Sequence, residues 1–321
     1  MQIKYNWSKI FLQRMDVLTM KVKIYFPDGH LEKPIWDALE TAGYKLKKAE
    51  RGYLIDVDHP NIIFKQVRPQ IMPFYIEMGK GDGGFTGEDI LENWKLKTEL
   101  KNIEILARLP LRPTKLVVAI SEEVYPEVES IEDFKAVVNN KIVFVASEFP
   151  EIAKEYVKKH KLNAIVFDPI GKTEASILPP TPEADMIIDV TEFGTTLRAN
   201  KCKIIDVVRD PVYSVFIANK RSLLDREKKE TMENLIIDVD EVIKSKNLVS
   251  LFFNVPKEED LKRIIDYLTA KGFDPTVSPL AKGAAAIHII LDKAQVKFLK
   301  PVLRNMGAKR IATSPVITFG D

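Results

Sequence analysis

Short runs of hydrophobic, β-branched residues alternate along the chain with stretches whose hydrophobic positions recur every three or four residues. The first pattern is typical of buried strands and the second of amphipathic helices, so the alternation indicates an α/β protein. We expect helices over 34–42 and 152–160, and a helix that follows the charged segment 225–233 and runs to Lys244. The expected strands are 22–26, 115–120, 141–146, 164–167, 186–190, 203–208 and 212–217.

The last part of the chain, after a polar hinge at Lys246 and Asn247, has the clearest pattern. Its two expected helices each end at a glycine, Gly272 and Gly307, which is a common helix stop. The expected elements are strand 248–255, helix 258–271, strands 276–280 and 285–291, helix 295–306 and strand 310–319. This βαββαβ order predicts a ferredoxin-like domain, and small domains of this type often bind amino acids or pair edge to edge.

Composition narrows the class of protein. The 321 residues suit two or three domains, and a net charge of +2 gives no electrostatic footprint for nucleic acid. A single cysteine, Cys202, fits a reducing compartment. Since the sequence shows neither a signal-peptide pattern nor an apolar run of membrane-spanning length, we expect a cytoplasmic protein that binds no membrane.

The segment 184–200 carries the most specific chemistry. A hydrophobic strand with Asp189 near its end leads through Gly194 into a helix that opens with Thr195 and Thr196. Free amides at a helix start and two hydroxyls would form a cradle for a phosphate, while a carboxylate beside it would hold ribose hydroxyls or a magnesium ion. An ordinary strand-to-helix turn with threonine caps is the alternative that spacing alone leaves open.

This segment resembles the phosphoribosyl-diphosphate loop of the ATP phosphoribosyltransferase family. The resemblance extends to 67–76 and 81–91, and to 254–256 and 275–280, where it matches the C-terminal domain of the long form of the family. It implies a two-lobed, periplasmic-binding-protein-like catalytic core with a ferredoxin-like regulatory domain. The implied boundaries are 1–113 with about 207–245 for the first lobe, 114–206 for the second lobe and 246–321 for the regulatory domain.

The resemblance also implies the activity. The phosphoribosyl group of phosphoribosyl diphosphate would pass to N1 of ATP, releasing pyrophosphate, in the first step of histidine biosynthesis. Such a displacement depends on placement and charge neutralisation rather than on a protein nucleophile. Mg²⁺ is the expected cofactor, histidine the expected feedback inhibitor, and a homo-oligomer between dimer and hexamer the expected assembly.

Site residues follow from the same resemblance, with the metal ligands left unassigned. Expected catalytic residues are Asp189, Glu174 and Arg68, although a solvated loop acid and a surface ion pair remain open for the last two. The diphosphate substrate is expected at Glu192, Gly194, Thr195, Thr196 and Leu197. The nucleotide cleft is expected at Arg51, Gly84, Thr86, Gly87 and Asp89, with Gly84 and Gly87 in a tight strand-to-helix turn. Histidine is expected at Thr276, Val277 and Ser278.

Four positions depart from the pattern of the family: Asp28 and His30 replace cations, Ile71 replaces an aspartate, and Phe193 replaces a small hydroxyl residue. A carboxylate about 4 Å from pyrophosphate could cost about 1 to 4 kcal/mol. An inactive or weakened relative that binds nucleotide or histidine is therefore the alternative function. A two-lobed solute-binding protein is a third hypothesis, which the C-terminal domain and the expected cytoplasmic location disfavour.

Overall fold

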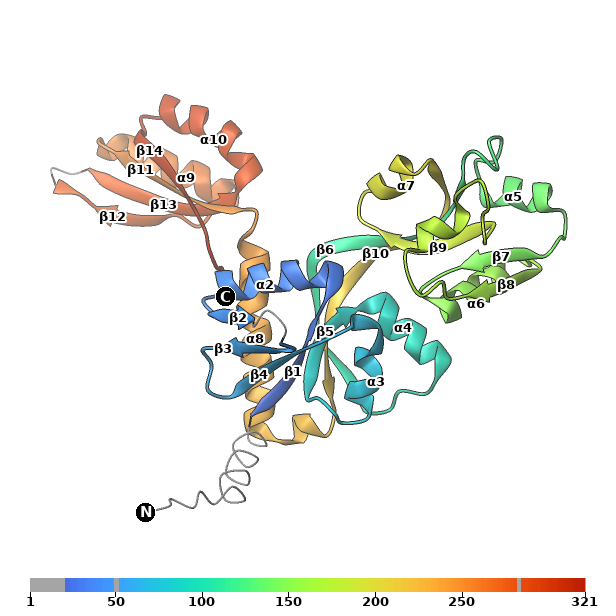
Figure 1. Ribbon diagram of the computed structural model, residues 1–321. Coiled ribbons are helices and arrows are strands. Elements are labelled where there is room, and N and C mark those ends of the chain that lie inside the picture. The colour runs from blue at the N-terminus through green and yellow to red at the C-terminus, as the bar shows by residue number, and fades with distance from the viewer. Residues whose placement is uncertain (1–20, 49–51, 282–283, 321) are drawn as a thin grey trace, which may run out of the picture. The chain divides into compact units, whose positions relative to one another are not determined.

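The computed structural model describes residues 21–48, 52–281 and 284–320. Contacts between residues divide the chain into two units (Figure 1). Unit 1 contains the chain up to Asp37 together with Tyr44–Ile236, and unit 2 contains Ala38–Gly43 together with Ile237–Asp321. No helix of these described ranges is long and apolar enough to cross a membrane.

Unit 1 is built on one ten-stranded mixed sheet with the order β2-β3-β4-β1-β5-β10-β6-β9-β7-β8. The parallel strands β1, β4 and β5 belong to one half of the sheet, and the parallel strands β7, β8 and β9 to the other. The strands are β1 (Val22–Pro27), β2 (Leu46–Lys48), β3 (Leu54–Val57), β4 (Ile62–Val67), β5 (Gly83–Gly87), β6 (Ile103–Ser121), β7 (Val143–Ala146), β8 (Ala164–Phe167), β9 (Met186–Thr191) and β10 (Cys202–Asn219).

Two long antiparallel strands, β6 and β10, join the halves (Figure 1). The first part of β6 pairs with the last part of β10 beside β5, and the last part of β6 pairs with the first part of β10 beside β9. Because the chain crosses between the halves through these two strands, unit 1 has two lobes and a two-stranded hinge. The expected fold class of the core is confirmed.

Helices cover both lobes, and each lobe has its own hydrophobic interior. Phe26, Phe64 and Ile35 are fully buried in the first lobe, while Phe134, Val145 and Ile188 are fully buried in the second. The helices are α2 (Glu32–Thr41), α3 (Met72–Glu77), α4 (Glu88–Lys97), α5 (Ile131–Val138), α6 (Pro150–Lys159), α7 (Thr195–Ala199) and α8 (Arg226–Ser245), with a short 3₁₀ segment at Thr173–Ile177.

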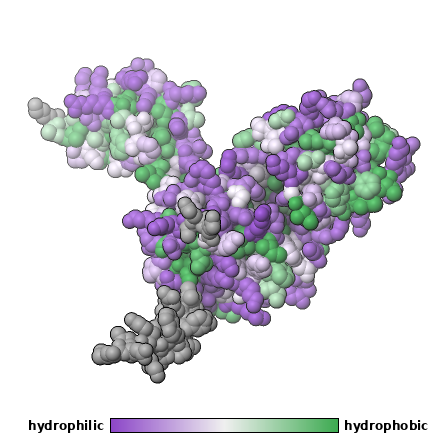
Figure 2. Space-filling view, viewed as in Figure 1, coloured by the Kyte–Doolittle hydropathy of each residue, from purple (hydrophilic) through white to green (hydrophobic). Residues whose placement is uncertain are grey.

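The surface of unit 1 is mainly hydrophilic in the viewed face, with a hydrophobic area over the strands at one end of the sheet (Figure 2). Ile142, Phe144 and Ile165 are about half exposed there. They lie on or next to β7 and β8, and β8 is an edge strand. A half-exposed hydrophobic edge of this kind is typical of a surface that contacts another chain.

Unit 2 confirms the predicted ferredoxin-like order. Its strands form one antiparallel sheet in the order β12-β13-β11-β14, and α9 and α10 pack on one face of that sheet through Ile264, Leu268, Leu299 and Leu303. The elements are β11 (Leu248–Val255), α9 (Glu258–Ala270), β12 (Thr276–Pro279), β13 (Ala285–Asp292), α10 (Lys293–Asn305) and β14 (Lys309–Pro315).

The division between the units falls inside α8, between Ile236 and Ile237, nine residues before the predicted boundary at 246. The last turns of α8 hold the end of the chain: the Ser245 hydroxyl donates to the carbonyl of Ile317 over 2.6 Å, and the Phe319 amide donates to the carbonyl of Glu241 over 3.2 Å. These contacts attach the second half of α8 to unit 2. The predicted domain boundaries themselves stay predictions.

Candidate active site

Polar residues collect where the parallel strands of unit 1 end. In the second lobe, β7 is followed by Ser147 and Glu148, β8 by Asp168 and β9 by Glu192. In the first lobe, Pro27 of β1 lies beside Val67 of β4, so the next residues, Asp28 and Arg68, emerge together. Ligands of open α/β sheets bind at the carboxyl ends of the strands, which makes this edge the candidate site.

The predicted phosphate loop follows β9. Gly194 has φ +66°, a left-handed conformation that suits glycine, and its amide donates to the Thr191 hydroxyl over 2.8 Å. The Arg198 guanidinium closes the loop by donating to the carbonyl of Phe193 over 2.7 Å. The first helical bond of α7 runs from the amide of Arg198 to the carbonyl of Gly194, so the amides before it have no helical acceptor. This loop can therefore offer amides to an anion.

The residues named for this loop have different environments. Thr195 and Thr196 are exposed, and their hydroxyls are accessible to a ligand. Leu197 is buried and packs against Ile187 and Cys202, so it anchors the loop to the lobe through its side chain. Phe193 is 69% exposed, so its ring lies on the surface of the loop.

Asp189 is an acid with an unusual environment. Desolvation, followed by the negative charges of Glu148 and Glu174, raises the pKa of Asp189 to about 7, although the Val190 amide and the Thr173 hydroxyl favour the ionised form. The Val190 amide donates to Oδ1 of Asp189 over 2.7 Å. A carboxyl group that titrates near neutral pH can exchange a proton with a substrate under physiological conditions.

Arg68 and Glu148 lie on the same cavity of about 670 Å³, which falls in the size range of small-molecule sites. The Gln70 amide donates to Glu148 over 3.4 Å and so links the two lobes, while the indole nitrogen of Trp94 donates to the Gln70 carbonyl over 2.6 Å. Desolvation first, and the charges of Asp168 and Glu174 after it, raise the pKa of Glu148. The cavity is lined by Arg68, Gln70, Ile90, Asn93, Trp94, Lys97, Glu148, Phe149, Pro150, Asp168, Ile170, Gly171 and Lys172.

The residues predicted for the nucleotide cleft are packed into the first lobe. Thr86 is fully buried, and its hydroxyl donates to the carbonyl of Pro69 over 3.1 Å. Burial raises the pKa of Asp89 to about 6, and a Cβ at Gly87 would lie 2.2 Å from an oxygen of this carboxyl group. The tight turn predicted at Gly84 is wrong, because Gly84 lies inside β5 and a Cβ there would meet the sulfur of Met72 at 2.6 Å. Arg51 lies outside the described residues.

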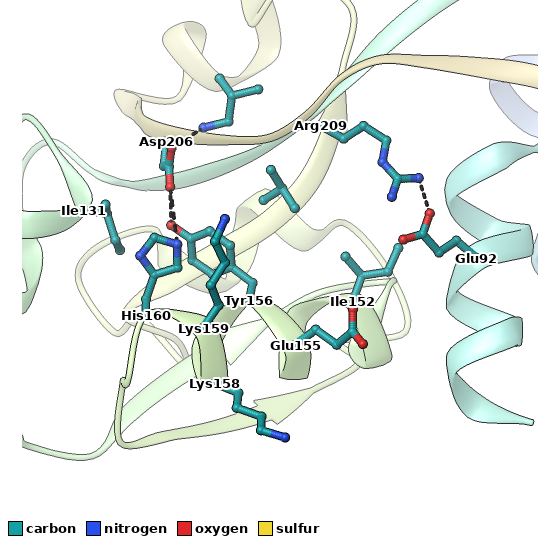
Figure 3. A pocket seen from close by; sticks show the side chains of 12 residues that line it. Glu92, Ile131, Ile152, Glu155, Tyr156, Lys158, Lys159, His160, Asp206 and Arg209 are labelled. Carbon is teal, nitrogen blue, oxygen red and sulfur yellow. Dashed lines mark hydrogen bonds and ion pairs between the residues drawn. The ribbon is translucent and has the colours of Figure 1, made fainter.

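A second cavity, of about 810 Å³, lies at the hinge and shares no lining residue with the first (Figure 3). Arg209 of β10 forms an ion pair with Glu92 of α4, and the Tyr156 hydroxyl donates to Asp206 over 2.6 Å. His160 stacks on Tyr156 at 4.3 Å between ring centroids and is mostly buried. The lysines beside it in the sequence, Lys158, Lys159 and Lys161, favour a solvated face, but the His160 side chain packs against Tyr156 and lies 3.9 Å from Asp206 at the hinge.

The residues predicted to bind histidine lie on the edge strand β12 of unit 2. Thr276 and Ser278 lie opposite His288 and Ala286 of β13, and Val277 lies opposite Ile287, which is buried in the core. Since side chains alternate along a strand, Thr276 and Ser278 share the face of the sheet that points away from the helices, and Val277 points to the other face. His288 stacks on Phe252 on the first of these faces, with 4.5 Å between centroids.

The fold and the cavity define a two-lobed α/β protein with a polar cleft at the ends of its parallel strands. Comparison with known proteins narrows this class: the family model "HisG: ATP phosphoribosyltransferase" matches residues 68–241, more than half of the chain. The chain belongs to the ATP phosphoribosyltransferase family, whose members transfer a phosphoribosyl group to ATP in the first step of histidine biosynthesis.

Relatives support this membership along most of the chain. An ATP phosphoribosyltransferase of Archaeoglobus fulgidus is 73% identical over 254 residues, which are 79% of this chain and 90% of that protein. One from Pelodictyon phaeoclathratiforme is 30% identical over 302 residues, 92% of this chain and 97% of that protein. Among solved structures, the ATP phosphoribosyl transferase (HisG:HisZ) complex from Thermotoga maritima has a TM-score of 0.54 at 22% identity, covering 70% of this chain and 98% of that chain, and so supports the fold.

Proposed function

We propose that the loop from Glu192 to Leu197 binds phosphoribosyl diphosphate, with its 5′-phosphate on the amides and hydroxyls of Thr195 and Thr196. The observation that carries this assignment is the left-handed Gly194 directly before the unpaired amides of α7. The Thr195→Val, Thr196→Val double variant keeps the size of both side chains and removes both hydroxyl donors. Calorimetric titration with phosphoribosyl diphosphate should show weaker binding, and unchanged affinity would refute the assignment.

Asp189 and Glu174 are the proposed catalytic acids. As adenine N1 forms its bond to the anomeric carbon, the bond from that carbon to the diphosphate oxygen breaks and the electron pair leaves with pyrophosphate. The adenine then gives up a proton from its exocyclic amino group. Asp189, whose pKa of about 7 suits proton transfer, is the proposed acceptor, and the negative charge of Glu174 contributes to that raised value.

Arg68 is the proposed contact for the phosphates of ATP. It is exposed at the end of β4 and lines the cavity that Glu148 and Trp94 also line. A guanidinium with five N–H donors suits phosphate oxygens, and the half-buried Trp94 offers a flat apolar surface beside it. Titration of an Arg68→Gln variant with ATP tests this assignment, because only the charge and not the fold should be lost.

Mg²⁺ is proposed to enter with the diphosphate of the substrate. Among the described residues, no group of three His, Cys, Asp or Glu side chains is arranged to hold a metal ion by itself. The negative charges of Glu148 and Glu174 nevertheless raise the pKa of Asp189 after desolvation, and such neighbouring carboxylates suit a cation carried by the substrate. When bound, Mg²⁺ would neutralise charge on the leaving pyrophosphate.

Unit 2 is proposed to bind histidine as a feedback inhibitor and to restrain the core. Thr276 and Ser278 share a sheet face with His288, whose Nε2 is buried and has no hydrogen-bond partner in the described part of the chain. These groups can donate hydrogen bonds to an amino acid and accept hydrogen bonds from it. A homo-oligomer of two to six chains is also proposed, and the half-exposed hydrophobic edge at β7 and β8 supports it. A cytoplasmic location fits such a biosynthetic enzyme.

The alternative function, a relative that binds its ligands but turns them over slowly, has one observation in its favour. Asp28 lies 3.8 Å from Arg68 at the end of the first lobe strands, so a negative charge competes for a cation of the cleft. The two functions differ in turnover rather than in binding. A protein that binds phosphoribosyl diphosphate in the presence of Mg²⁺ but forms no phosphoribosyl-ATP would support the alternative.

A further inference from the structure

We infer that Arg112 positions the substrate by binding the diphosphate of phosphoribosyl diphosphate, and that Glu192 holds this guanidinium in place before the substrate arrives. The inference rests on the proposed function and adds a cation that the sequence patterns did not identify. Arg112 lies in β6 at the crossing between the lobes, directly after the buried Leu111 and two residues before Thr114, which pairs with Val212 of β10. Arg112 belongs to the irregular stretch of β6 between Leu109 and Thr114, and the regular pairs on both sides place this stretch at the hinge.

Arg112 contacts the proposed phosphate loop directly. One of its terminal nitrogens lies 3.1 Å from Oε2 of Glu192, with the Arg112 side chain about half exposed and Glu192 about one third exposed. An exposed ion pair of this kind contributes little to stability and exchanges its partners readily. When the substrate binds, Glu192 can therefore turn to the ribose hydroxyls, and Arg112 can turn to the oxygens of the diphosphate.

Arg112 also acts on the turn that ends β1 in the first lobe. This turn, Asp28-Gly29-His30, has an acid and an imidazole and therefore supplies no fixed positive charge. Desolvation, and after it the positive charge of Arg112, lower the pKa of His30, so the imidazole is neutral at pH 7. One guanidinium thus affects a turn of the first lobe while it contacts the phosphate loop of the second.

The chemistry favours a diphosphate over other groups of the substrates. A diphosphate presents several anionic oxygens, and a planar guanidinium can bind two of them at once. Arg68 at the same edge lies near Asp28, which offsets part of its charge. Arg112 forms an ion pair with the loop carboxylate of Glu192, and that carboxylate would have an alternative partner in the ribose. Substrate binding can therefore free the Arg112 guanidinium from Glu192, so that it can bind the diphosphate.

The test compares Arg112→Gln with a matched control, Arg108→Gln, in the full chain. Arg108 lies on the same strand and pairs with Glu88 over 2.7 Å, so the control also loses one exposed ion pair of β6. Loss of a charge-assisted phosphate contact should raise the KM for phosphoribosyl diphosphate about tenfold in Arg112→Gln, with the KM for ATP unchanged. The control should leave both KM values within about twofold.

A rescue variant separates a substrate contact from a structural role. Adding His30→Arg to Arg112→Gln places a cation on the neighbouring turn and should restore most of the affinity for phosphoribosyl diphosphate, which repacking of the hinge could not do. Calorimetric titration with phosphoribosyl diphosphate measures this even where turnover is slow, and Arg112→Lys serves if Arg112→Gln does not fold. An unchanged affinity in a folded Arg112 variant, beside an active parent enzyme, would overturn the inference and leave the proposed function intact. A parent enzyme that neither binds this substrate nor forms phosphoribosyl-ATP would overturn the proposed function itself.

Discussion

At the scale of single residues, burial of the Asp189 carboxyl group lowers the stability of the folded protein near neutral pH. Its folded-state pKa of about 7 lies above the ordinary value of 3.8, so the unfolded chain releases this proton at lower pH than the folded chain does. The contribution of Asp189 to stability is therefore most favourable below about pH 4 and falls as the pH rises towards 7. The carboxyl group that we propose for proton transfer therefore destabilises the fold near neutral pH, where the enzyme would use it.

Replacing Asp189 by asparagine should separate these two effects. At pH 8 the Asp189→Asn variant should be more stable than the parent by about 2 to 4 kcal/mol, because partial exposure reduces the full effect of the pKa difference. At pH 4 the two proteins should unfold at nearly the same urea concentration. The same variant should form phosphoribosyl-ATP far more slowly. Equal stability of both proteins at pH 8 would show that Asp189 is not desolvated.

The turn after β1 allows a second prediction at this scale. Asp28 and His30 place a negative and a neutral group where a diphosphate would gain from cations. The double change Asp28→Lys and His30→Arg should tighten binding of phosphoribosyl diphosphate, because it adds two positive charges to this turn and frees Arg68 from Asp28. Calorimetry gives the affinity directly. A looser complex would mean that the turn does not face this substrate.

At the scale of elements, the sequence predicts strands and helices well where one pattern persists. The order of unit 2 is clear from sequence, since the two central strands β11 and β13 alternate between buried and more exposed positions and Gly272 and Gly307 end the helices with φ +81° and +102°. In unit 1 the segments 203–208 and 212–217, predicted as two strands, belong to the single strand β10, which continues through several register shifts. The hydrophobic pattern of β10 alone does not show that β10 continues through these register shifts, because the continuity depends on its pairing with β6.

The glycines around β5 show a second reason for such errors. Gly83 and Gly84 do not have a left-handed backbone. A larger residue is excluded there because a Cβ atom would lie within 3 Å of Phe216 at Gly83 and of Met72 at Gly84. This requirement comes from residues far away in the sequence. By contrast, the left-handed Gly194 is set by its own loop, which is why the loop could be recognised from the sequence and the packing of β5 could not.

A helix cap in unit 2 gives an element-scale prediction. Asp292 caps α10 by accepting from the Ala294 amide over 2.7 Å, and Gln295 accepts from the Asp292 amide over 3.2 Å. Asp292→Ala should destabilise unit 2 by about 1 kcal/mol, whereas the exposed Asp266→Ala on α9 should change stability by less than about 0.5 kcal/mol. Urea denaturation measures both. Equal effects of the two changes would contradict the capping role.

At the scale of the whole molecule, the chain contains a two-lobed unit and a ferredoxin-like unit, for which we propose catalysis and the sensing of histidine, respectively. Each unit has its own buried core, so each can respond to its own ligand. Coupling between two such sites is reciprocal: a ligand that favours the inactive state must bind less tightly when substrate favours the active state. Histidine should therefore bind more weakly to the enzyme in the presence of substrate.

Removing the chain from Asn247 onward tests this coupling. The shortened protein should keep phosphoribosyl-ATP formation and lose inhibition by histidine, because the ferredoxin-like sheet with Thr276 and Ser278 is then absent. The cut also removes the contacts of Ser245 and Glu241 with the end of the chain, so some loss of stability in α8 is expected. If calorimetry detects no histidine binding to the intact chain at millimolar concentration, the sensing role is wrong and unit 2 serves assembly alone.

The cleft at the ends of the parallel strands is the proposed place where ATP is joined to phosphoribosyl diphosphate. A spectrophotometric assay of phosphoribosyl-ATP formation, run with both substrates and Mg²⁺, tests it most directly when the parent and the Thr195→Val, Thr196→Val variant are measured side by side. The account predicts product from the parent and a much higher KM for phosphoribosyl diphosphate in the variant. A folded parent protein that forms no product, or a variant with unchanged kinetics, would contradict it.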